Sequence, residues 1–508
     1  MKDVYGIDLG TTNSCIAVIG DDGQPEVIKN LDDNYTTPSV VYYDDAGEQY
    51  VGSEAKSMMG GDIKRTVAFI KREMSNKNYQ RDIDGIIVTP INVSALILKK
   101  VVDDANQQRE YEGLPPIHKA VVTVPAYFGN DERMRTEQAA KIAGIEVLGL
   151  LNEPTAAALN YGTKGLNGKT FLIYDLGGGT FDVSIMRMKD GELDTLSSDG
   201  DHHLGGVDWD ICLIDYALQK EGLGVSYDDI KDSKEVGKML IAAEICKKNL
   251  SKAEKAAFKF VYQRKQHFID ITRGMFEELT EDLVDRTIQI VEKAKKLALE
   301  RTDSLSIDDI ILVGGSSYMP MIKKRLTEEY PDSNIRLDNL EPDRAVAKGA
   351  AIQAAALAGQ ATKIKLGEDL ATRSYGLGAN IGDETFHYAC VNVIKRTDPL
   401  IYEGKHEFCT SVENQEKVTL ELFENISTDD AVELEKCTLL EEKELSWGKS
   451  VPKGTEVIAN VIRDANGTVK ISVSCEGSRP VIFDIKGDGI LSEEEIEREK
   501  RRLANKHV

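Results

Sequence analysis

One stretch, residues 171–182, constrains the fold of this chain most strongly. An apolar run is followed there by Asp-Leu-Gly-Gly-Gly-Thr and a second apolar run. Three consecutive glycines let the backbone adopt positive φ and approach a ligand closely. Successive N–H groups in such a turn form a nest for anions, phosphate above all. Asp175 and Asp182 flank the turn, and carboxylates are ligands that Mg²⁺ prefers. A plain glycine hairpin with a capping aspartate would show the same pattern, so this stretch alone leaves both interpretations open.

A similar pattern occurs near the start of the chain, where Asp-Leu-Gly-Thr-Thr-Asn (residues 8–13) joins two apolar runs. This is an internal repeat. A third glycine turn, Gly314-Gly315-Ser316, follows the apolar residues 310–313 and precedes a helical pattern. The order strand, glycine turn and helix suits the binding of a nucleoside or phosphate. Three such turns predict two similar lobes that hold one nucleotide between them.

These turns resemble the phosphate and adenosine motifs of the superfamily that contains actin, sugar kinases and heat-shock-chaperone ATPases. Further stretches are similar to the DnaK-type seventy-kilodalton heat-shock chaperone family: residues 124–128, 152–158, 203–206 and 345–351. The resemblance runs from about residue 2 to residue 360 and continues more weakly to about residue 491. The family continues there into a long helical lid, of which this chain carries the first turns.

Composition limits the other function classes. A length of 508 residues favours two or more domains, and a net charge of −23 argues against nucleic-acid partners and anionic membranes. The seven cysteines are scattered without a Cys-x-x-Cys pair, as expected for a reduced, cytoplasmic protein. No apolar run reaches membrane-spanning length, and the first strand pattern at Val4 leaves no room for a signal peptide.

The predicted fold class is α/β: a two-lobed actin-like ATPase domain followed by an antiparallel β-sandwich and a short C-terminal helix. The expected parts are residues 1–360 (lobes 1–168 and 169–360), a polar linker at 361–374, the sandwich at 375–490 and the helix at 491–508. Helical patterns cover 94–102, 130–143, 209–218, 234–250, 277–299 and 343–357. Period-two patterns cover 391–394, 417–422, 432–435 and 455–462, and Asn466-Gly467 indicates a hairpin.

The resemblance implies a catalytic set of one lysine, a hydroxyl and several carboxylates. By motif these are Lys71, Thr180, Glu153, Asp8 and Asp175, of which the two aspartates would hold Mg²⁺ largely through water. A cation that faces the transferred phosphoryl and carboxylates that orient water suit ATP hydrolysis. Taken singly, Lys71 is more often a solvated surface lysine, and Glu153 before Pro154 is more often the start of a helix.

The resemblance also implies the residues that bind ATP or ADP. On the phosphate side these are Gly10, Thr11, Thr12, Asn13, Gly177, Gly178, Gly179, Gly205, Gly206, Gly314, Gly315, Ser316 and Asp343; on the adenosine side they are Glu244, Lys247, Lys248, Ser251 and Tyr318. Lys248 and Tyr318 stand where many relatives have arginine. A guanidinium stacks on a base as a plane and lysine does not, whereas the Tyr318 ring offers a stacking face.

The peptide site is implied by the resemblance as well. Phe408 to Ser411 matches the edge of the family's groove, and Val418 with Leu420 matches its central apolar pocket. An extended apolar segment of an unfolded protein would bind there through backbone hydrogen bonds and one buried side chain. The alternation of these residues is equally typical of an ordinary sandwich core.

The expected function is that of an ATP-hydrolysing chaperone; a small-molecule kinase and an actin-like filament protein remain alternatives. The family's partners include a J-domain co-chaperone and a nucleotide-exchange factor. Gly149 stands where the family has an arginine that docks the J-domain, which predicts poor stimulation by a standard J-domain or a divergent partner. The linker's apolar residues are Ile364, Leu366 and Leu370, which predicts weak docking on the ATPase domain.

Overall fold

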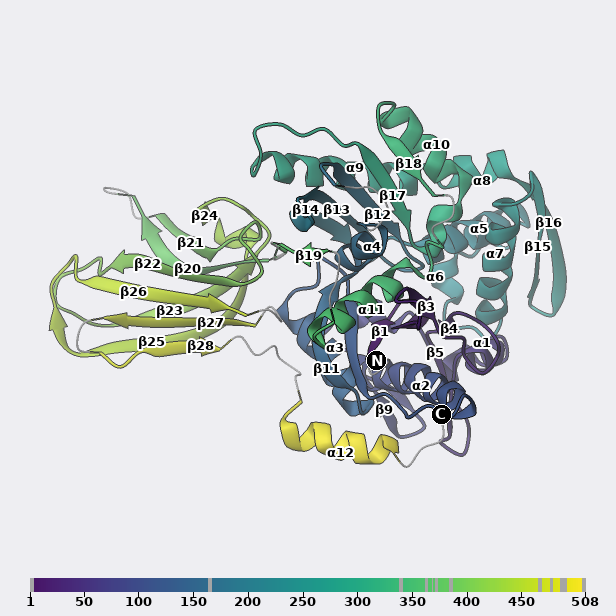
Figure 1. Ribbon diagram of the computed structural model, residues 1–508, viewed down its shortest axis with the longest axis horizontal. Helices are drawn as coiled ribbons and strands as arrows, with labels where there is room; N and C mark the ends of the chain where they lie inside the picture. The colour runs from purple at the N-terminus through teal and green to yellow at the C-terminus, as the bar shows by residue number, and fades with distance from the viewer. Residues whose placement is uncertain are drawn as a thin grey trace. The chain divides into compact units, whose positions relative to one another are not determined.

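The computed structural model describes residues 4–162, 167–337, 341–360, 364–367, 369–370, 373–382, 387–464, 468–475, 478–484 and 491–504 (Figure 1). The chain divides into two compact units. The first contains residues 1–126, 134–365 and 489–508, and the second contains residues 127–133 and 366–488. The expected boundaries at 360 and 374 remain predictions.

The first unit contains two six-stranded sheets of similar design. In one, the order is β11-β10-β1-β2-β3, with β4 paired to β2. Its strands are β1 (Tyr5–Asp8), β2 (Asn13–Ile19), β3 (Pro25–Val27), β4 (Thr37–Pro38), β10 (Lys119–Val124) and β11 (Glu146–Asn152). β1 pairs antiparallel with β2 and parallel with β10, so the turn at residues 9–12 joins the central antiparallel pair.

The other sheet has the order β18-β17-β12-β13-β14-β19. Its strands are β12 (Thr170–Leu176), β13 (Phe181–Lys189), β14 (Glu192–Asp201), β17 (Asp309–Val313), β18 (Asn334–Arg336) and β19 (Lys365–Leu366). Here too the glycine turn joins an antiparallel pair, β12 and β13, while β12 pairs parallel with β17. The repeat in the sequence is therefore a repeat in the structure.

Helices and small sheets surround these two sheets. The helices are α1 (Ser53–Met59), α2 (Pro90–Tyr111), α3 (Asn130–Ile142), α4 (Glu153–Gly162), α5 (Gly206–Lys220), α6 (Tyr227–Ile230), α7 (Val236–Leu250), α8 (Arg273–Leu279), α9 (Glu281–Leu299), α10 (Pro320–Glu329) and α11 (Ala345–Leu357). The small sheets contain β5 (Val40–Tyr43), β6 (Gln49–Val51), β7 (Thr66–Ala68), β8 (Arg81–Ile83), β9 (Ile86–Val88), β15 (Lys255–Tyr262) and β16 (Lys265–Thr272).

The single helix predicted over 277–299 is wrong, because Thr280 divides it into α8 and α9. Thr280 is fully buried and has φ −120° and ψ 13°, outside the helical region. Its hydroxyl donates to the carbonyl of Phe276 at 2.8 Å. A threonine hydroxyl that bonds the backbone in this way competes with helix continuation, and apolar spacing does not report it.

Helix α11 comes late in the sequence yet packs on the first sheet. A Cβ on Gly6 of β1 would lie 2.0 Å from the backbone nitrogen of Ala351, and one on Gly349 would lie 1.7 Å from the carbonyl oxygen of Ala156. Only glycine allows backbones to approach so closely. The alanine-rich composition of α11 thus serves close packing against β1 and α4.

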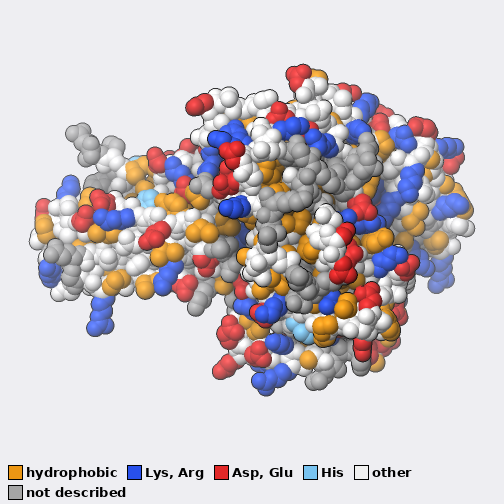
Figure 2. Space-filling model, in the orientation of Figure 1, with side chains coloured by type: hydrophobic (Ala, Val, Ile, Leu, Met, Phe, Trp, Pro, Cys, Tyr) orange, Lys and Arg blue, Asp and Glu red, His pale blue; other side chains and the backbone are white. Residues whose placement is uncertain are grey.

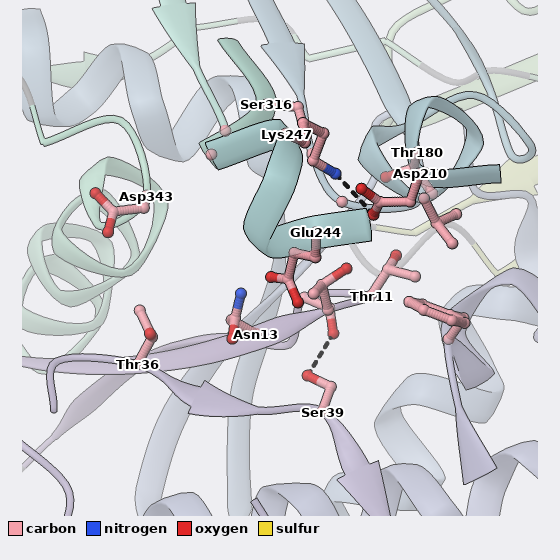
Figure 3. A pocket seen from close by; sticks show the side chains of 18 of the residues that line it. Thr11, Asn13, Thr36, Ser39, Thr180, Asp210, Glu244, Lys247, Ser316 and Asp343 are labelled. Atoms are coloured by element: carbon pink, nitrogen blue, oxygen red, sulfur yellow. Dashed lines mark hydrogen bonds and ion pairs between the residues drawn. The ribbon is translucent and has the colours of Figure 1, made fainter. Parts of the chain in front are cut away.

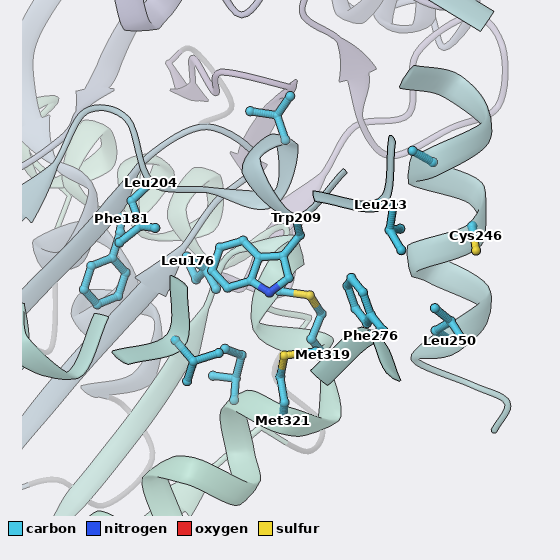
Figure 4. Close-up of a cluster of buried hydrophobic side chains, with 14 of the residues drawn as sticks. Leu176, Phe181, Leu204, Trp209, Leu213, Cys246, Leu250, Phe276, Met319 and Met321 are labelled. Atoms are coloured by element: carbon cyan, nitrogen blue, oxygen red, sulfur yellow. The ribbon is translucent and has the colours of Figure 1, made fainter. Parts of the chain in front are cut away.

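A cluster of buried hydrophobic side chains around the second sheet holds helices next to two of the glycine turns (Figure 4). Trp209 of α5 is fully buried at its centre, among Leu176, Met319 and Phe276. Trp209 lies three residues after Gly206, and Met319 follows the turn at Gly314. Packing between Trp209 and Met319 therefore ties the start of α5 to the third glycine turn.

Part of the predicted linker is an added strand. The amide of Lys365 donates to the carbonyl of Gly191 at 2.9 Å, which places β19 beside β14 at the edge of the second sheet. Ile364 is 7% exposed, and a Cβ on Gly162 would lie 2.3 Å from its Cδ1 atom. Residues 361–363, 368 and 371–372 of the predicted linker lie outside the described residues.

The second unit contains an antiparallel β-sandwich, as predicted. One sheet has the order β24-β21-β20-β23-β25 and the other the order β22-β26-β27-β28. The strands are β20 (Ser374–Ile381), β21 (His387–Ile394), β22 (Tyr402–Cys409), β23 (Gln415–Asn425), β24 (Ala431–Val432), β25 (Thr438–Val451), β26 (Glu456–Arg463), β27 (Val469–Cys475) and β28 (Val481–Asp484). β26 pairs antiparallel with β27, while the predicted Asn466-Gly467 turn lies outside the described residues.

The strand predicted over 432–435 is wrong beyond Val432. After the two-residue β24, a 3₁₀ turn, η4, covers Leu434–Lys436. The apolar–polar alternation of Val432 to Glu435 therefore reflects one buried residue in a short edge strand and a half-buried residue in a turn.

The C-terminal helix α12 (Glu493–Ala504) belongs to the first unit. Its capping box is present: the amide of Ser492 donates to Glu495 at 2.8 Å, and the amide of Glu495 donates to the Ser492 hydroxyl at 3.3 Å. Ile496 and Leu503 are buried in the core cluster that also contains Tyr43 and Leu96. Most other residues of α12 are charged, so the helix packs through the one apolar stripe that contains Ile496 and Leu503.

On the face shown in Figure 2, acidic and basic side chains are interspersed, with hydrophobic side chains scattered among them. The net negative charge therefore does not gather into one patch on that face. Among the residues that the structure describes, no helix combines the length and the apolar composition needed to cross a membrane.

Candidate nucleotide-binding site

A cavity of about 600 Å³ in the first unit gathers residues from all three glycine turns (Figure 3). The following predicted residues line it: Asp8, Gly10, Thr11, Thr12, Asn13, Lys71, Glu153, Asp175, Gly177, Gly178, Thr180, Glu244, Lys247, Lys248, Ser251, Gly314, Gly315, Ser316, Tyr318 and Asp343. Segments distant in the sequence thus meet around one space large enough for a nucleotide.

Gly179, Gly205 and Gly206 do not line the cavity but lie behind its wall. The amide of Gly206 donates to the carbonyl of Gly177 at 3.0 Å, and a Cβ on Gly205 would lie 2.5 Å from the backbone of Gly179. These glycines therefore let the start of α5 pack against the phosphate turn. Their expected role as direct ligand contacts stays a prediction.

The first two glycine turns touch each other. A Cβ on Gly178 would lie 1.9 Å from the Thr12 hydroxyl oxygen, and one on Gly179 would lie 2.2 Å from Cγ2 of Thr11. The hydroxyls of Thr11 and Thr12 are buried and have no hydrogen-bond partner within the described protein. Buried hydroxyls normally have partners, so these two indicate a ligand that supplies them.

Lys71 lines the cavity together with several carboxylates. It is 4% exposed and forms an ion pair with Glu153. The preceding Phe69 has φ 59° and ψ 23°, a left-handed conformation that is uncommon for an aromatic residue. This turn brings Lys71 into the cavity through the short 3₁₀ helix at Ile70–Glu73.

The carboxylates near Lys71 favour protonation when no cation is bound. Burial and the neighbouring Glu153 raise the pKa of Asp8 to about 7, although Lys71 opposes the rise. Burial, Glu153 and Asp8 also raise the pKa of Asp175 well above its usual range. A divalent cation would relieve this repulsion, because it favours the ionised forms.

The residues present fit Mg²⁺ held through water. Asp8 and Asp175 are the hard oxygen donors that Mg²⁺ prefers, and Mg²⁺ keeps several waters and needs only one or two carboxylates. Among the described residues, no group of three or more His, Cys, Asp or Glu side chains is placed to hold a metal directly. Both facts favour an ion that also binds the phosphates of a nucleotide.

Helix α7 also lines the cavity, through Glu244, Lys247 and Lys248. Glu244 forms ion pairs with Lys56 of α1 at 2.6 Å and Lys248 at 2.7 Å. Burial alone would raise the pKa of Glu244, but these two ammonium groups bring it to about 2. Glu244 is therefore ionised at neutral pH and links α1 to α7.

Lys247 faces the phosphate turns. Its ammonium donates to the carbonyl of Gly206 at 2.6 Å and to Asp210 at 2.8 Å, and Figure 3 shows Lys247 and Asp210 directed toward each other. Burial raises the pKa of Asp210 to about 6 despite Lys247. Ser251 donates to the carbonyl of Lys247 at 3.2 Å.

Tyr318 ends the 3₁₀ turn that follows Gly314, and its side chain is 46% exposed where it lines the cavity. Lys248 lies on α7 and is held by Glu244. At the two positions where the resemblance led us to expect arginine, the cavity thus offers an aromatic ring and an ion-paired lysine.

Several residues that the structure brings to the site were not among the predicted catalytic or nucleotide-binding residues. Arg72 donates to the carbonyl of Gly179 at 2.7 Å and pairs with Asp208 at 2.6 Å, which fixes the back of the phosphate turn. Asp182 is buried and accepts from the amide of Ala126 at 2.9 Å. Asp210 and Lys56 line the cavity. Asp182 had been identified from the sequence as a carboxylate that flanks the glycine turn, and adjacency to Lys71 was a signal for Arg72. Lys56 and Asp210 left no signal in the sequence.

The candidate peptide residues lie in the second unit. Phe408 is on β22, Val418 and Leu420 are on β23, and all three belong to the sandwich core cluster. Leu420 is 8% exposed, whereas Phe408, Val418 and Ser411 are half-buried. Their role in peptide binding stays a prediction.

Comparison with known proteins agrees with this geometry. The Hsp70 protein family model matches residues 4–507. Chaperone protein DnaK from two strains of Halobacterium salinarum, R1 and NRC-1, is in each case 36% identical over 508 residues, which cover 98% of this chain and 77% of the relative. The match spans both units, and the chain therefore belongs to the Hsp70 family.

Proposed function

We propose that this protein is an ATP-dependent chaperone that hydrolyses ATP to ADP and phosphate and binds extended apolar segments of unfolded proteins. The observation that carries the proposal is the cavity in which two similar glycine turns face Lys71 and a group of buried carboxylates. Membership of the Hsp70 family supports nucleotide binding and peptide binding in general. The roles of individual residues given next are part of this proposal.

The turn residues would bind the phosphates. The unpartnered hydroxyls of Thr11 and Thr12 are donors suited to phosphate oxygens, and Gly10 and Gly178 line the same cavity. Asp8 and Asp175 would hold Mg²⁺ through water, and the ion, when bound, supplies charge neutralisation on the phosphates. Thr180 lines the same cavity and would contact the terminal phosphate.

Lys71 would stabilise the charge that develops on the transferred phosphoryl group. Its ion pair with Glu153 keeps the ammonium in place before the nucleotide arrives. Glu153 and the ionised aspartates are then available to orient a water molecule and accept its proton. A preorganised cation in a buried site acts on the transition state more strongly than one in water.

The second unit would supply the peptide site. Val418 and Phe408 are half-buried, which leaves part of each side chain available to a bound apolar residue. Among the described strands, β22 is at the edge of its sheet and pairs with β26 on one side, so its other side would suit an extended peptide. We further propose a cytoplasmic location and, as partners, a divergent J-domain co-chaperone and a nucleotide-exchange factor.

The test is the rate of ATP hydrolysis with and without an apolar heptapeptide. We expect the peptide to stimulate turnover and a matched peptide with charged residues at the same positions to leave it unchanged. Phosphoryl transfer to a sugar would instead favour the small-molecule kinase, and ATP-dependent sedimentation without peptide stimulation would favour a filament protein. A rate unaffected by every peptide would contradict the chaperone proposal.

A further inference from the structure

Two thiols meet in the β-sandwich, away from the groups proposed to bind nucleotide or peptide. Cys390 lies on β21 and is fully buried, while Cys437 follows the 3₁₀ turn η4 and is half-buried. Both belong to one small cluster with Phe423, Val432 and Leu434, distinct from the main sandwich core. Both are free thiols, and Cys437 packs against the cluster that contains Cys390.

The surroundings hold Cys390 firmly. Its sulfur accepts a hydrogen bond from the Asn425 side chain at 3.6 Å, and the same amide donates to Asn392 at 2.8 Å. A Cβ on Gly376 of the neighbouring strand would lie 2.4 Å from this sulfur. The Cys390 side chain therefore has little space in which to turn away from Cys437.

Cys437 lies on a segment that crosses from one edge of the sheet to the other. In the order β24-β21-β20-β23-β25, the chain passes from the edge strand β24 to the opposite edge strand β25 through η4 and Cys437. The Cys437 thiol donates to the carbonyl of Glu433 at 3.4 Å, and its amide donates to the carbonyl of Leu434 at 2.9 Å. Cys437 thus lies on the crossing segment and packs against the cluster that contains Cys390 of β21.

We propose that Cys390 and Cys437 form a redox-sensitive disulfide that fastens the crossing segment at η4 to β21 under oxidising conditions. The proposed oxidant is hydrogen peroxide. The more exposed Cys437 thiolate attacks one peroxide oxygen to give a sulfenic acid, and hydroxide leaves and is protonated to water. Cys390 then attacks that sulfur, the S–O bond breaks, and a second water leaves. Two thiols and one peroxide give one disulfide and two waters.

The environment sets the speed of this reaction. Burial and the nearby Cys437 raise the pKa of Cys390 to about 12. Partial burial also raises the pKa of Cys437, and its hydrogen bond with Cys390 opposes part of that rise. Because the thiolate is the nucleophile, oxidation is slow at neutral pH and becomes faster as the pH rises.

The bond would act on the stability of the second unit rather than on hydrolysis. A disulfide between residues 390 and 437 closes a loop that includes β22, β23 and β24. Closing a long loop restricts the unfolded chain, so the oxidised sandwich should melt at a higher temperature, by roughly 5–10 °C. The proposal does not depend on the proposed function.

The experiment uses the full chain, treated with hydrogen peroxide at pH 7 and pH 8.5, quenched, alkylated and digested for mass spectrometry. We expect a linked peptide pair containing Cys390 and Cys437, lighter than the two reduced peptides by two hydrogens, and faster formation at the higher pH. Cys437→Ser should abolish the linked pair and the rise in melting temperature. Cys409→Ser, which removes an exposed thiol on β22, should change neither.

Three outcomes would overturn the proposal: Cys437 recovered as sulfinic acid without a link, a linked pair that involves another cysteine, or both thiols alkylated after treatment that oxidises Cys409. Cys390→Ser changes a buried side chain. It is therefore measured beside a second variant, Cys437→Ala, which changes a half-buried side chain. Dithiothreitol must reverse the melting shift in the wild-type chain, and a shift that persists after reduction would also count against the disulfide.

Discussion

The nucleotide cavity and the candidate peptide site hold their residues in opposite ways. In the cavity, glycines without space for a Cβ and buried ion pairs fix groups from distant segments around one space. In the β-sandwich, Phe408, Val418 and Leu420 are alternating residues that also belong to the core. Burying the charged groups of the cavity costs stability, so these residues serve the chemistry of the site. The sandwich residues serve stability whether or not a peptide binds.

The largest expected effect tests the cavity. Lys71→Ala should lower the rate of hydrolysis by about 10²–10³-fold while ATP binding stays nearly intact, because the ammonium is needed most in the transition state. A single-turnover assay measures the chemical step directly. Lys56→Ala is the matched control: it removes another cavity lysine, paired with Glu244, and should change nucleotide affinity more than chemistry.

Loss of Lys71 also leaves Glu153 buried without its partner, which lowers stability. Thermal melting of each variant separates that effect from catalysis, and Lys71→Met keeps the buried volume. Wild-type chemistry in a folded Lys71→Ala variant would remove Lys71 from the mechanism.

The second prediction concerns pH. Because burial and Glu153 raise the pKa of Asp8 to about 7, a proton must leave Asp8 before Mg²⁺ binds, so affinity is full above pH 7 and falls below it. We expect Mg²⁺ affinity to fall about tenfold per pH unit between pH 7 and pH 5 if one proton is displaced. Titration calorimetry with Mg²⁺ and ADP measures this. Asp8→Asn should weaken binding and flatten the dependence; an unchanged slope would assign the proton elsewhere.

The third prediction asks whether the sandwich residues serve the core or the groove. Leu420→Ala should lower the free energy of unfolding by about 2–5 kcal/mol, as expected for a buried leucine. Val418→Ala removes fewer buried atoms and should weaken an apolar peptide about three- to tenfold with a smaller loss of stability. Peptide anisotropy and melting are measured on both variants. Equal peptide affinity in folded Val418→Ala would assign Val418 to the core alone.

Sequence reasoning predicted the parts of this molecule that depend on special backbone chemistry. The turns at Gly10, Gly178 and Gly314 needed glycine for close approach, so the pattern itself specified them. Lys56 and Asp210 escaped notice because a long-range ion pair leaves no local pattern. The break at Thr280 was missed since apolar spacing continues through it. Strand β19 was missed because two residues that pair through backbone alone have no period.

The last and smallest expected effect concerns coupling between ATP and peptide. Among the described linker residues, Ile364 is buried beside Gly162 in the first unit and Leu370 is buried in the second, and the segment adds the short strand β19. Burial of one such side chain contributes about 1.5–3 kcal/mol, the size of a typical allosteric coupling of about 1–3 kcal/mol. We therefore expect ATP to change peptide affinity by less than about tenfold, or 1.4 kcal/mol. Anisotropy of a labelled apolar peptide in ATP and then in ADP measures this ratio. Ile364→Ser should bring it close to one, while Ile245→Ser, at an isoleucine that is 54% exposed on α7, should leave it unchanged. A hundredfold weakening in ATP, retained in Ile364→Ser, would show that the coupling passes through contacts other than this linker.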